Sequence, residues 1–261
     1  MTLNNDFIVI VPFYNCKDKI ELSLISIFTQ DFDNLGIIIR DDCSTDGSDL
    51  IVKKMLGINL DNEKTKFMNK DVIFIRNKEK FYPVGNTYDS VINYVNNKNA
   101  IISVVDGDDM LTKKNAVTKI NNIYIKNNNL WLVWSQHTTS SGNLGQSKAL
   151  PKDEIIYNNR NYWSISHFRT CKINLFFYLN IDDLKDPFTN EKFSSFAGDA
   201  AFLYPFIEMC GNEHSFFLNE SLYHYNDNLL SNEHNKNIND AIKYGLYYKN
   251  NAKRYKKIKN L

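Results

Sequence analysis

Residues 100–111 read AIISVVDGDDML, an apolar run followed directly by a cluster of acidic residues. Ile101–Val105 contains four β-branched apolar residues in a run too short for a helix, so it predicts a buried strand of a mostly parallel sheet. Three carboxylates follow at once, from Asp106, Asp108 and Asp109. Like charges this close repel one another unless a cation, a hydrogen-bond network or water compensates them. We therefore expect a divalent metal at the end of this strand.

The position of the acidic run supports a ligand site. In open α/β sheets, ligands bind beyond the carboxyl ends of the strands, and Gly107 lets the backbone approach a ligand or turn sharply. A polar turn is the alternative interpretation, because Asp and Gly are ordinary turn residues. A calcium loop of the EF-hand type is excluded, since the sixth position from Asp106 is Leu111 and the twelfth is Val117.

Strand and helix patterns alternate on both sides of this stretch, which is typical of parallel βαβ units with right-handed crossovers. Asn59–Lys70 is polar and is expected to be a surface connection. Apolar runs predict strands at Phe7–Val11, Gly36–Arg40, Asp71–Ile75, Ile101–Val105 and Leu130–Ser135, and helical spacing predicts helices at Lys17–Thr29, Leu50–Leu56, Asn86–Val95 and Lys113–Ile125.

Composition excludes several classes of protein. With 31 Lys+Arg against 30 Asp+Glu in 261 residues, a single α/β domain is expected and nucleic-acid binding is disfavoured. The four cysteines are scattered, which suits reduced thiols in a cytosol-like compartment. The sequence has no apolar run of membrane-spanning length, so a soluble cytoplasmic protein is expected. Six basic residues within 249–261 suggest a solvated helix, or peripheral contact with an anionic membrane.

The second half of the chain carries a polar and aromatic set suited to a sugar ligand: Trp163, His167 and Arg169. A partly buried aromatic cluster is the alternative interpretation. Asp199 opens a predicted helix and suits an N-cap. Phe216–Leu218 and Ser221–Tyr225 are predicted to be short strands, the second of which contains His224.

Taken together, these motifs resemble the family 2 glycosyltransferases. The matching elements are IVIVPFYN at Ile8–Asn15, DDCSTDG at Asp41–Gly47, VVDGDDML at Val104–Leu111, and more loosely Val84–Asn86 and Gly198–Asp199. The family often has Glu where Gly198 stands. The resemblance implies a GT-A fold: one Rossmann-like α/β domain over 1–261 with a mostly parallel sheet flanked by helices. It divides the chain into a nucleotide-sugar half, 1–111, an acceptor half, 112–235, and a basic helical tail, 236–261.

The resemblance also implies roles for individual residues. Nucleotide-sugar binding falls to Pro12, Asn15, Asp41, Asp42, Asn86, Asp106 and Gly107. Either Asp41 or Asp42 would accept from an imide N–H of the base, such as that of uracil. Asp106, Asp108 and His224 would hold Mn²⁺ or Mg²⁺, hard cations that prefer oxygen ligands, and Asp109 would support them.

The implied reaction transfers a sugar, with inversion, from a nucleotide-diphosphate sugar such as a UDP-sugar to a hydroxyl on a glycan, lipid or protein. Asp199 would be the general base, and Trp163, His167 and Arg169 would bind the acceptor. A nucleotide-sugar-forming nucleotidyltransferase is the alternative enzyme, although Phe13–Lys17 has no glycine for its phosphate loop. A non-catalytic carbohydrate-binding protein on the same fold is the alternative outside enzymes.

Overall fold

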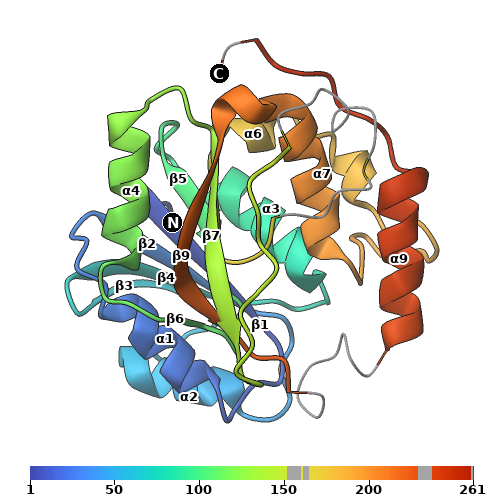
Figure 1. The fold of residues 1–261 in the computed structure, drawn as a ribbon. Helices are drawn as coiled ribbons and strands as arrows, with labels where there is room; N and C mark the ends of the chain where they lie inside the picture. Colours follow the sequence, from blue (N-terminus) through green and yellow to red (C-terminus); the bar gives the residue numbers. More distant parts are fainter. Residues whose placement is uncertain (152–159, 161–164, 229–236, 260) are drawn as a thin grey trace.

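A nine-stranded mixed sheet with the strand order β3-β4-β2-β1-β5-β8-β7-β9-β6 forms the centre of the molecule (Figure 1). The computed structural model describes residues 1–151, 160, 165–228, 237–259 and 261. The strands are β1 Phe7–Phe13, β2 Leu35–Asp41, β3 Asn62–Phe67, β4 Lys70–Arg76, β5 Ile101–Val104, β6 Met110–Leu111, β7 Leu132–Thr139, β8 Arg169–Lys172 and β9 Ser215–Tyr225.

Helices cover both faces of this sheet (Figure 1). They are α1 Ile20–Phe28, α2 Ser48–Leu56, α3 Tyr82–Tyr94, α4 Ala116–Lys126, α6 Asn174–Phe177, α7 Gly198–Cys210 and α9 Ile238–Asn250, with short 3₁₀ helices at Ile181–Leu184 and Asn212–His214. One core cluster joins the sheet to α3 and α7, and the other joins it to α1, α2 and α4. Alternate residues of β1 divide between them, Ile8 facing the first and Val9 the second, as the two-residue period of a strand requires.

The expected α/β architecture is confirmed, and the parallel pattern holds for β4, β2, β1 and β5. Beyond β5 the sheet becomes mixed, because β8 pairs antiparallel with both β5 and β7, and β6 pairs antiparallel with β9. The first of these antiparallel pairings places Arg169–Lys172, which was not predicted as a strand, beside the acidic stretch. The mixed part of the sheet thereby brings the second half of the chain to the ligand edge.

Other segments also differ from the sequence prediction. The two short strands expected at Phe216–Leu218 and Ser221–Tyr225 form one strand, β9, whose register against β7 shifts near its middle. The polar connection expected at Asn59–Lys70 contains the edge strand β3, paired antiparallel with β4. Its residues alternate between exposed and half-buried, so no apolar run marks the strand. The C-terminal tail is helical only to Asn250, and 251–259 continues without helix. Within the described part of the chain, none of the helices combines the length and the apolarity that crossing a bilayer requires.

Candidate active site

A cavity of about 820 Å³ lies beyond the carboxyl ends of β1 and β5, next to the first turns of α3 and α7. This is the edge at which open α/β sheets bind ligands. Nine of the residues singled out from the sequence line it: Pro12, Asp42, Asn86, Asp106, Gly107, Asp108, His167, Arg169 and Asp199. Asn15, Asp41 and His224 are not among its lining residues, and Trp163 lies outside the described residues. The cavity therefore unites both halves of the predicted site.

The three carboxylates after β5 have different surroundings. Asp109 is buried, and both its oxygens are engaged: Oδ2 accepts from the Tyr223 hydroxyl at 2.6 Å and Oδ1 from the Asn226 amide at 2.7 Å. Asp106 and Asp108 instead line the cavity. Asp109 thus fixes the end of β9 to the acidic loop, whereas Asp106 and Asp108 border the cavity.

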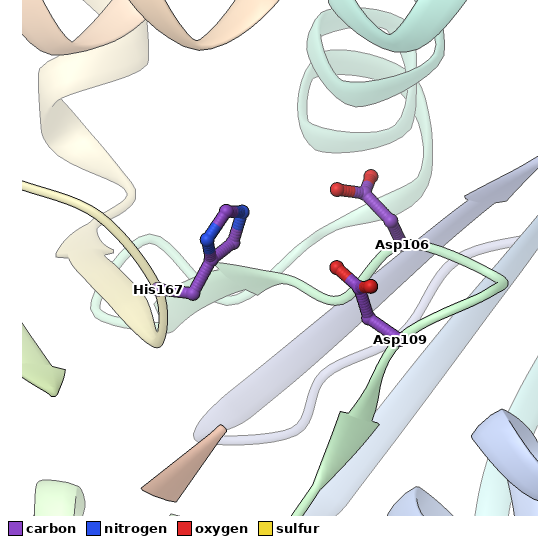
Figure 2. Close-up of side chains that lie close together, drawn as sticks. All are labelled: Asp106, Asp109 and His167. Atoms are coloured by element: carbon purple, nitrogen blue, oxygen red, sulfur yellow. The ribbon is translucent and has the colours of Figure 1, made fainter. Parts of the chain in front are cut away.

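Carboxylate oxygens of Asp106 and Asp109 and a ring nitrogen of His167 lie within 4.8 Å of one another. Figure 2 shows the two carboxylates pointing toward the imidazole across the site. His167 comes from the segment before β8, so the antiparallel pairing of β5 with β8 produces this closeness. Because about sixty residues separate Asp106 from His167 in the chain, no local sequence pattern indicated that their side chains lie close together.

The electrostatics of the acidic loop fit a divalent cation. Burial raises the pKa of Asp106 to about 6; the Arg169 guanidinium opposes this shift, and the Asp108 and Asp199 carboxylates add to it. Burial also raises the pKa of Asp108, against a 3.1 Å hydrogen bond donated by Asn226. Two cavity-lining carboxylates whose ionisation is disfavoured suit a hard cation, which stabilises their charged forms. Asp106 and Asp108 on the cavity wall, and Asp109 and His167 in the cluster with Asp106, are the groups that could hold such an ion.

His224 does not line the cavity. Its ring nitrogens lie 3.5 Å from Thr138 Oγ1 and 3.2 Å from Ser140 Oγ, and the residue pairs with Met110 across β6 and β9. Two residues farther along the chain, Asn226 contacts Asp108 directly. Tyr223 and Asn226 are thus polar residues from this segment that reach the acidic loop, and the sequence analysis identified neither.

The acidic pair after β2 is split by the fold. Asp41 is fully buried, where Oδ1 accepts from the Ser44 amide at 2.9 Å and Oδ2 lies 3.1 Å from Arg76 Nε. Asp42 lines the cavity, and its oxygens accept from the backbone N–H groups of Phe81 and Tyr82 at 2.8 and 3.0 Å. Of the two, Asp42 is thus the carboxylate placed to meet a ligand, and it also binds the first turn of α3.

Asn15 joins two loops and does not line the cavity. It adopts a positive φ of 47°, its Oδ1 accepts from the Thr45 amide at 2.8 Å, and its own amide donates to Ser44 Oγ at 3.0 Å. Asn86 is the opposite case: its Oδ1 accepts from Asn77, but within the described residues its buried Nδ2 has no hydrogen-bond partner. A buried donor without a partner at a cavity wall is a ready contact for a ligand oxygen.

Asp199 belongs to a connected polar group on the far wall of the cavity. Arg169 Nη1 donates to Asp199 Oδ2 at 3.2 Å, and Arg169 Nη2 lies 3.1 Å from His167 Nε2. The carboxylates of Asp199 and Asp106 raise the pKa of Arg169 against the opposing effect of burial, whereas burial and Arg169 lower the pKa of His167 well below its usual value. A neutral His167 can therefore accept from the permanently charged guanidinium.

The N-cap role expected for Asp199 is wrong, because α7 begins at Gly198 and Ala197 is its N-cap. Asp199 lies inside the first turn, where the helix dipole still favours a negative charge. The family often has Glu where this chain has Gly198, and the packing around this residue accounts for the glycine. A Cβ there would lie 2.8 Å from Val84 Cγ2, so the close packing of α7 on α3 leaves no room for a larger side chain.

Gly107 is required by packing as well as by position. A Cβ at this residue would lie 2.4 Å from Phe13 Cβ, and the Gly107 amide donates to the Pro12 carbonyl at 3.0 Å. The acidic loop therefore lies directly against the end of β1. Other cavity residues had no motif to identify them, among them Tyr14, Lys80, His137 and Tyr225.

Solved structures with the same fold include known sugar-transferring proteins. Those similar to this chain include residues 1–349 of TarS from S. aureus in complex with UDP, with 18% identity and a TM-score of 0.59 over 95% of this chain. This chain spans 66% of that TarS chain. Glucosyl-3-phosphoglycerate synthase from Mycobacterium tuberculosis, in complex with Mn²⁺, UDP and glucosyl-3-phosphoglycerate, has 14% identity and a TM-score of 0.57, covering 94% of this chain and 78% of that one.

A third structure, the mannosyltransferase PcManGT from Pyrobaculum calidifontis in complex with GDP-Man and Mn²⁺, has 14% identity and a TM-score of 0.54, covering 85% of this chain and 57% of that one. At these identities the likeness establishes the fold, and it confirms the expected GT-A architecture. No curated protein sequence matches this chain. A family model described as glycosyl transferase family 2 matches residues 8–182, and the chain therefore belongs to glycosyl transferase family 2.

Proposed function

We propose that this protein is an inverting glycosyltransferase that moves a sugar from a nucleotide-diphosphate sugar to a hydroxyl on a glycan, lipid or protein. The proposal depends on one observation: carboxylates from two different elements line the same cavity. Asp106 and Asp108 line it at the end of β5, and Asp199 lines it at the start of α7. A metal-binding acidic loop and a separate carboxylate are what a single displacement on a diphosphate donor needs.

The donor half of the cavity suits a nucleotide. Asp42 offers a carboxylate to an imide N–H of the base, and the unpartnered Asn86 Nδ2 offers a donor to a sugar or phosphate oxygen. Pro12 forms part of the adjoining wall. UDP is the nucleotide proposed, supported by the UDP complexes of TarS and of the glucosyl-3-phosphoglycerate synthase, although PcManGT was solved with GDP-Man.

Mn²⁺ or Mg²⁺ is the proposed cofactor, held by Asp106 and Asp108. Two of the similar structures were solved with Mn²⁺. When bound, such an ion neutralises the charge that develops on the departing diphosphate. Asn226 and Tyr223 would orient the acidic loop through their hydrogen bonds to Asp108 and Asp109.

Asp199 is the proposed general base. Its carboxylate takes the proton of the acceptor hydroxyl while that oxygen forms a bond to the anomeric carbon and the bond from this carbon to the diphosphate oxygen breaks. Because attack and departure occur on opposite faces of the sugar, the configuration inverts in one displacement without a covalent enzyme intermediate. His167 and Arg169 belong to the acceptor side of this arrangement, and Trp163 is proposed to join them there.

A donor screen tests the proposal. The purified protein is incubated with UDP-, GDP-, dTDP- and ADP-sugars in Mn²⁺ or in chelator, and release of the nucleoside diphosphate is measured. We expect release from one donor class in Mn²⁺ only, and its near-complete loss in Asp108→Ala. The matched control is Asp182→Ala, which removes an exposed carboxylate that does not line the cavity and should keep full activity. A parallel incubation with nucleoside triphosphates and sugar 1-phosphates tests the alternative enzyme, because that reaction releases pyrophosphate. Release of pyrophosphate there would select a nucleotidyltransferase, and release of neither product would favour a carbohydrate-binding protein.

A further inference from the structure

Helix α9 has apolar residues on two of its faces. Ala241, Tyr244 and Tyr248 are buried against the body of the protein. On another face, Ile238, Ile242 and Leu246 are 52, 54 and 50% exposed, and their spacing of four places them in one stripe along the helix. Figure 1 shows α9 at the outer edge of the molecule, beside α7. Packing among the described residues does not account for these three exposed apolar side chains, so the stripe is a candidate contact surface.

The stripe lies between two hollows. On one side is a shallow groove of about 500 Å³, whose lining includes Phe188, Lys243 and Tyr247. On the other side is the active-site cavity, which α9 also lines. Ile242 and Leu246 line both, so they form a crest at the border of the active site. Whatever covers this crest lies beside the cavity.

The charge around the stripe selects among occupants. Lys243 and Lys249 flank it on α9. Other basic residues of the region are already paired with acidic partners, as Lys253 is with Asp183 at 3.5 Å. A second copy of this chain would bring the same lysines into contact with these, which is unfavourable. An anionic lipid surface complements both the cations and the apolar stripe.

We propose that the α9 stripe, Ile238, Ile242 and Leu246, docks this protein on an anionic lipid bilayer. The three side chains enter the headgroup region and the flanking lysines contact lipid phosphates. Docking in this orientation puts the active-site cavity at the lipid surface. The consequence that the acceptor is a lipid-anchored molecule rests on the proposed function, whereas the docking itself does not.

Vesicle co-sedimentation tests the proposal with the whole protein. Vesicles of phosphatidylcholine alone are compared with vesicles containing about 30% phosphatidylglycerol, where the basic residues should act. We expect binding to the anionic vesicles only, weakened by salt, and at least about tenfold weaker binding by the double variant Ile242→Glu, Leu246→Glu. Lys243→Gln together with Lys249→Gln should weaken binding less and reduce its salt dependence.

The matched control adds the same charge elsewhere. Leu50 on α2 and Ile125 on α4 are 64 and 70% exposed, so Leu50→Glu with Ile125→Glu should bind vesicles like the native protein. Native protein that stays in the supernatant, or an Ile242→Glu, Leu246→Glu variant that sediments normally, would overturn the proposal. So would a native dimer that this variant converts to a monomer without any vesicle binding. Vesicle binding by a protein that releases no nucleotide would leave the docking intact and refute the proposed function alone.

Discussion

The Arg169 guanidinium donates a hydrogen bond to Asp199 Oδ2 at 3.2 Å, linking the strand β8 to the first turn of α7. The side chains of these residues are 15 and 36% exposed, so the pair lies partly shielded from water at the cavity wall. A charge-assisted hydrogen bond of this kind restricts the orientation of the carboxylate. The proposed base is thus held in place before any acceptor binds.

Replacing Asp199 by Asn tests the base. The amide oxygen can still accept from the Ala200 N–H, which Asp199 Oδ1 does at 2.9 Å, so stability should change little. An amide cannot take a proton from the acceptor, so transfer should fall by about 10²–10⁴ while donor affinity stays nearly constant. Steady-state transfer and nucleotide titration measure the two effects. Full transfer by this variant would require another base, and the buried Glu208, already bound by Arg160 and Arg254, is poorly placed for that role.

Replacing Arg169 by Lys tests positioning. A lysine keeps the charge but lacks the planar fork that spans Asp199 and His167, so the carboxylate should become less ordered. We expect kcat to fall by about 10–100-fold with an unchanged KM for the donor. Arg169→Ala should fall further. A change confined to the donor KM would mean that Arg169 acts on the donor and not on the base.

The stability contributed by Asp106, in the proposed metal site, should change with pH in a defined direction. The pKa of Asp106 is raised from 3.8 to about 6 in the folded protein, so between these values the folded state binds more protons than the unfolded state. Its contribution to stability is therefore complete below the lower value and is lost as the pH rises to about 6. In chelator, the melting temperature of the native protein relative to Asp106→Asn should fall over this window. Mn²⁺ should stabilise the native protein more at about pH 7.5 than at about pH 5, because it competes with the proton.

Two outcomes of the same measurement would contradict the prediction for Asp106. If native protein and Asp106→Asn show parallel melting curves from pH 4 to pH 7 in chelator, the carboxyl of Asp106 titrates normally. If Mn²⁺ stabilises Asp106→Asn as much as the native protein, the ion binds without this residue. Asp182→Asn, which removes an exposed carboxylate, controls for the general change in charge.

The acidic pair after β2 should separate specificity from stability. Asp42→Ala removes the carboxylate that lines the cavity, so the preference for UDP over ADP should fall by about tenfold, the range for one lost hydrogen bond to a charged group. Asp41→Ala should keep that preference and lose about 1–3 kcal/mol of stability, because it leaves Arg76 without this partner. Nucleotide titration and urea unfolding measure the two. An unaltered preference in Asp42→Ala would exclude base recognition by this residue.

The parts of the fold that depend on local patterns could be predicted from sequence. The strand β5 and its acidic loop are contiguous, and a short β-branched run followed by carboxylates at a strand end is readable without tertiary information. The edge strand β3 was missed because its residues alternate between exposed and half-buried without an apolar run. The strand β8 was missed because its four residues, Arg169–Lys172, are stabilised by two neighbouring strands and not by their own composition.

The site residues divide along the same line. Asp41 and Asp42 are adjacent, and which of them faces the cavity depends on how β2 ends, which side-chain alternation alone does not specify. Asn226 reaches Asp108 and Asp109 only because β9 pairs with β6, a contact between segments more than a hundred residues apart. The sequence analysis singled out His224 in this segment, whereas the strand pairing brings Tyr223 and Asn226 to the loop.

Glu208 connects three separate stretches of chain. Its buried carboxylate accepts from Arg160, from Arg254 and from the Tyr255 amide. Trimming the protein after Asn250 would remove two of these donors and the segment that lies along α7, while β1, β2 and β5 would keep every contact described for the nucleotide. A protein shortened in this way should still bind a nucleotide sugar, but α7, which carries Asp199, would lose the contacts that Arg254 and Tyr255 make with Glu208. Truncation after Asn250 should therefore weaken acceptor binding while donor binding stays intact, so the C-terminal segment serves one of the two substrates.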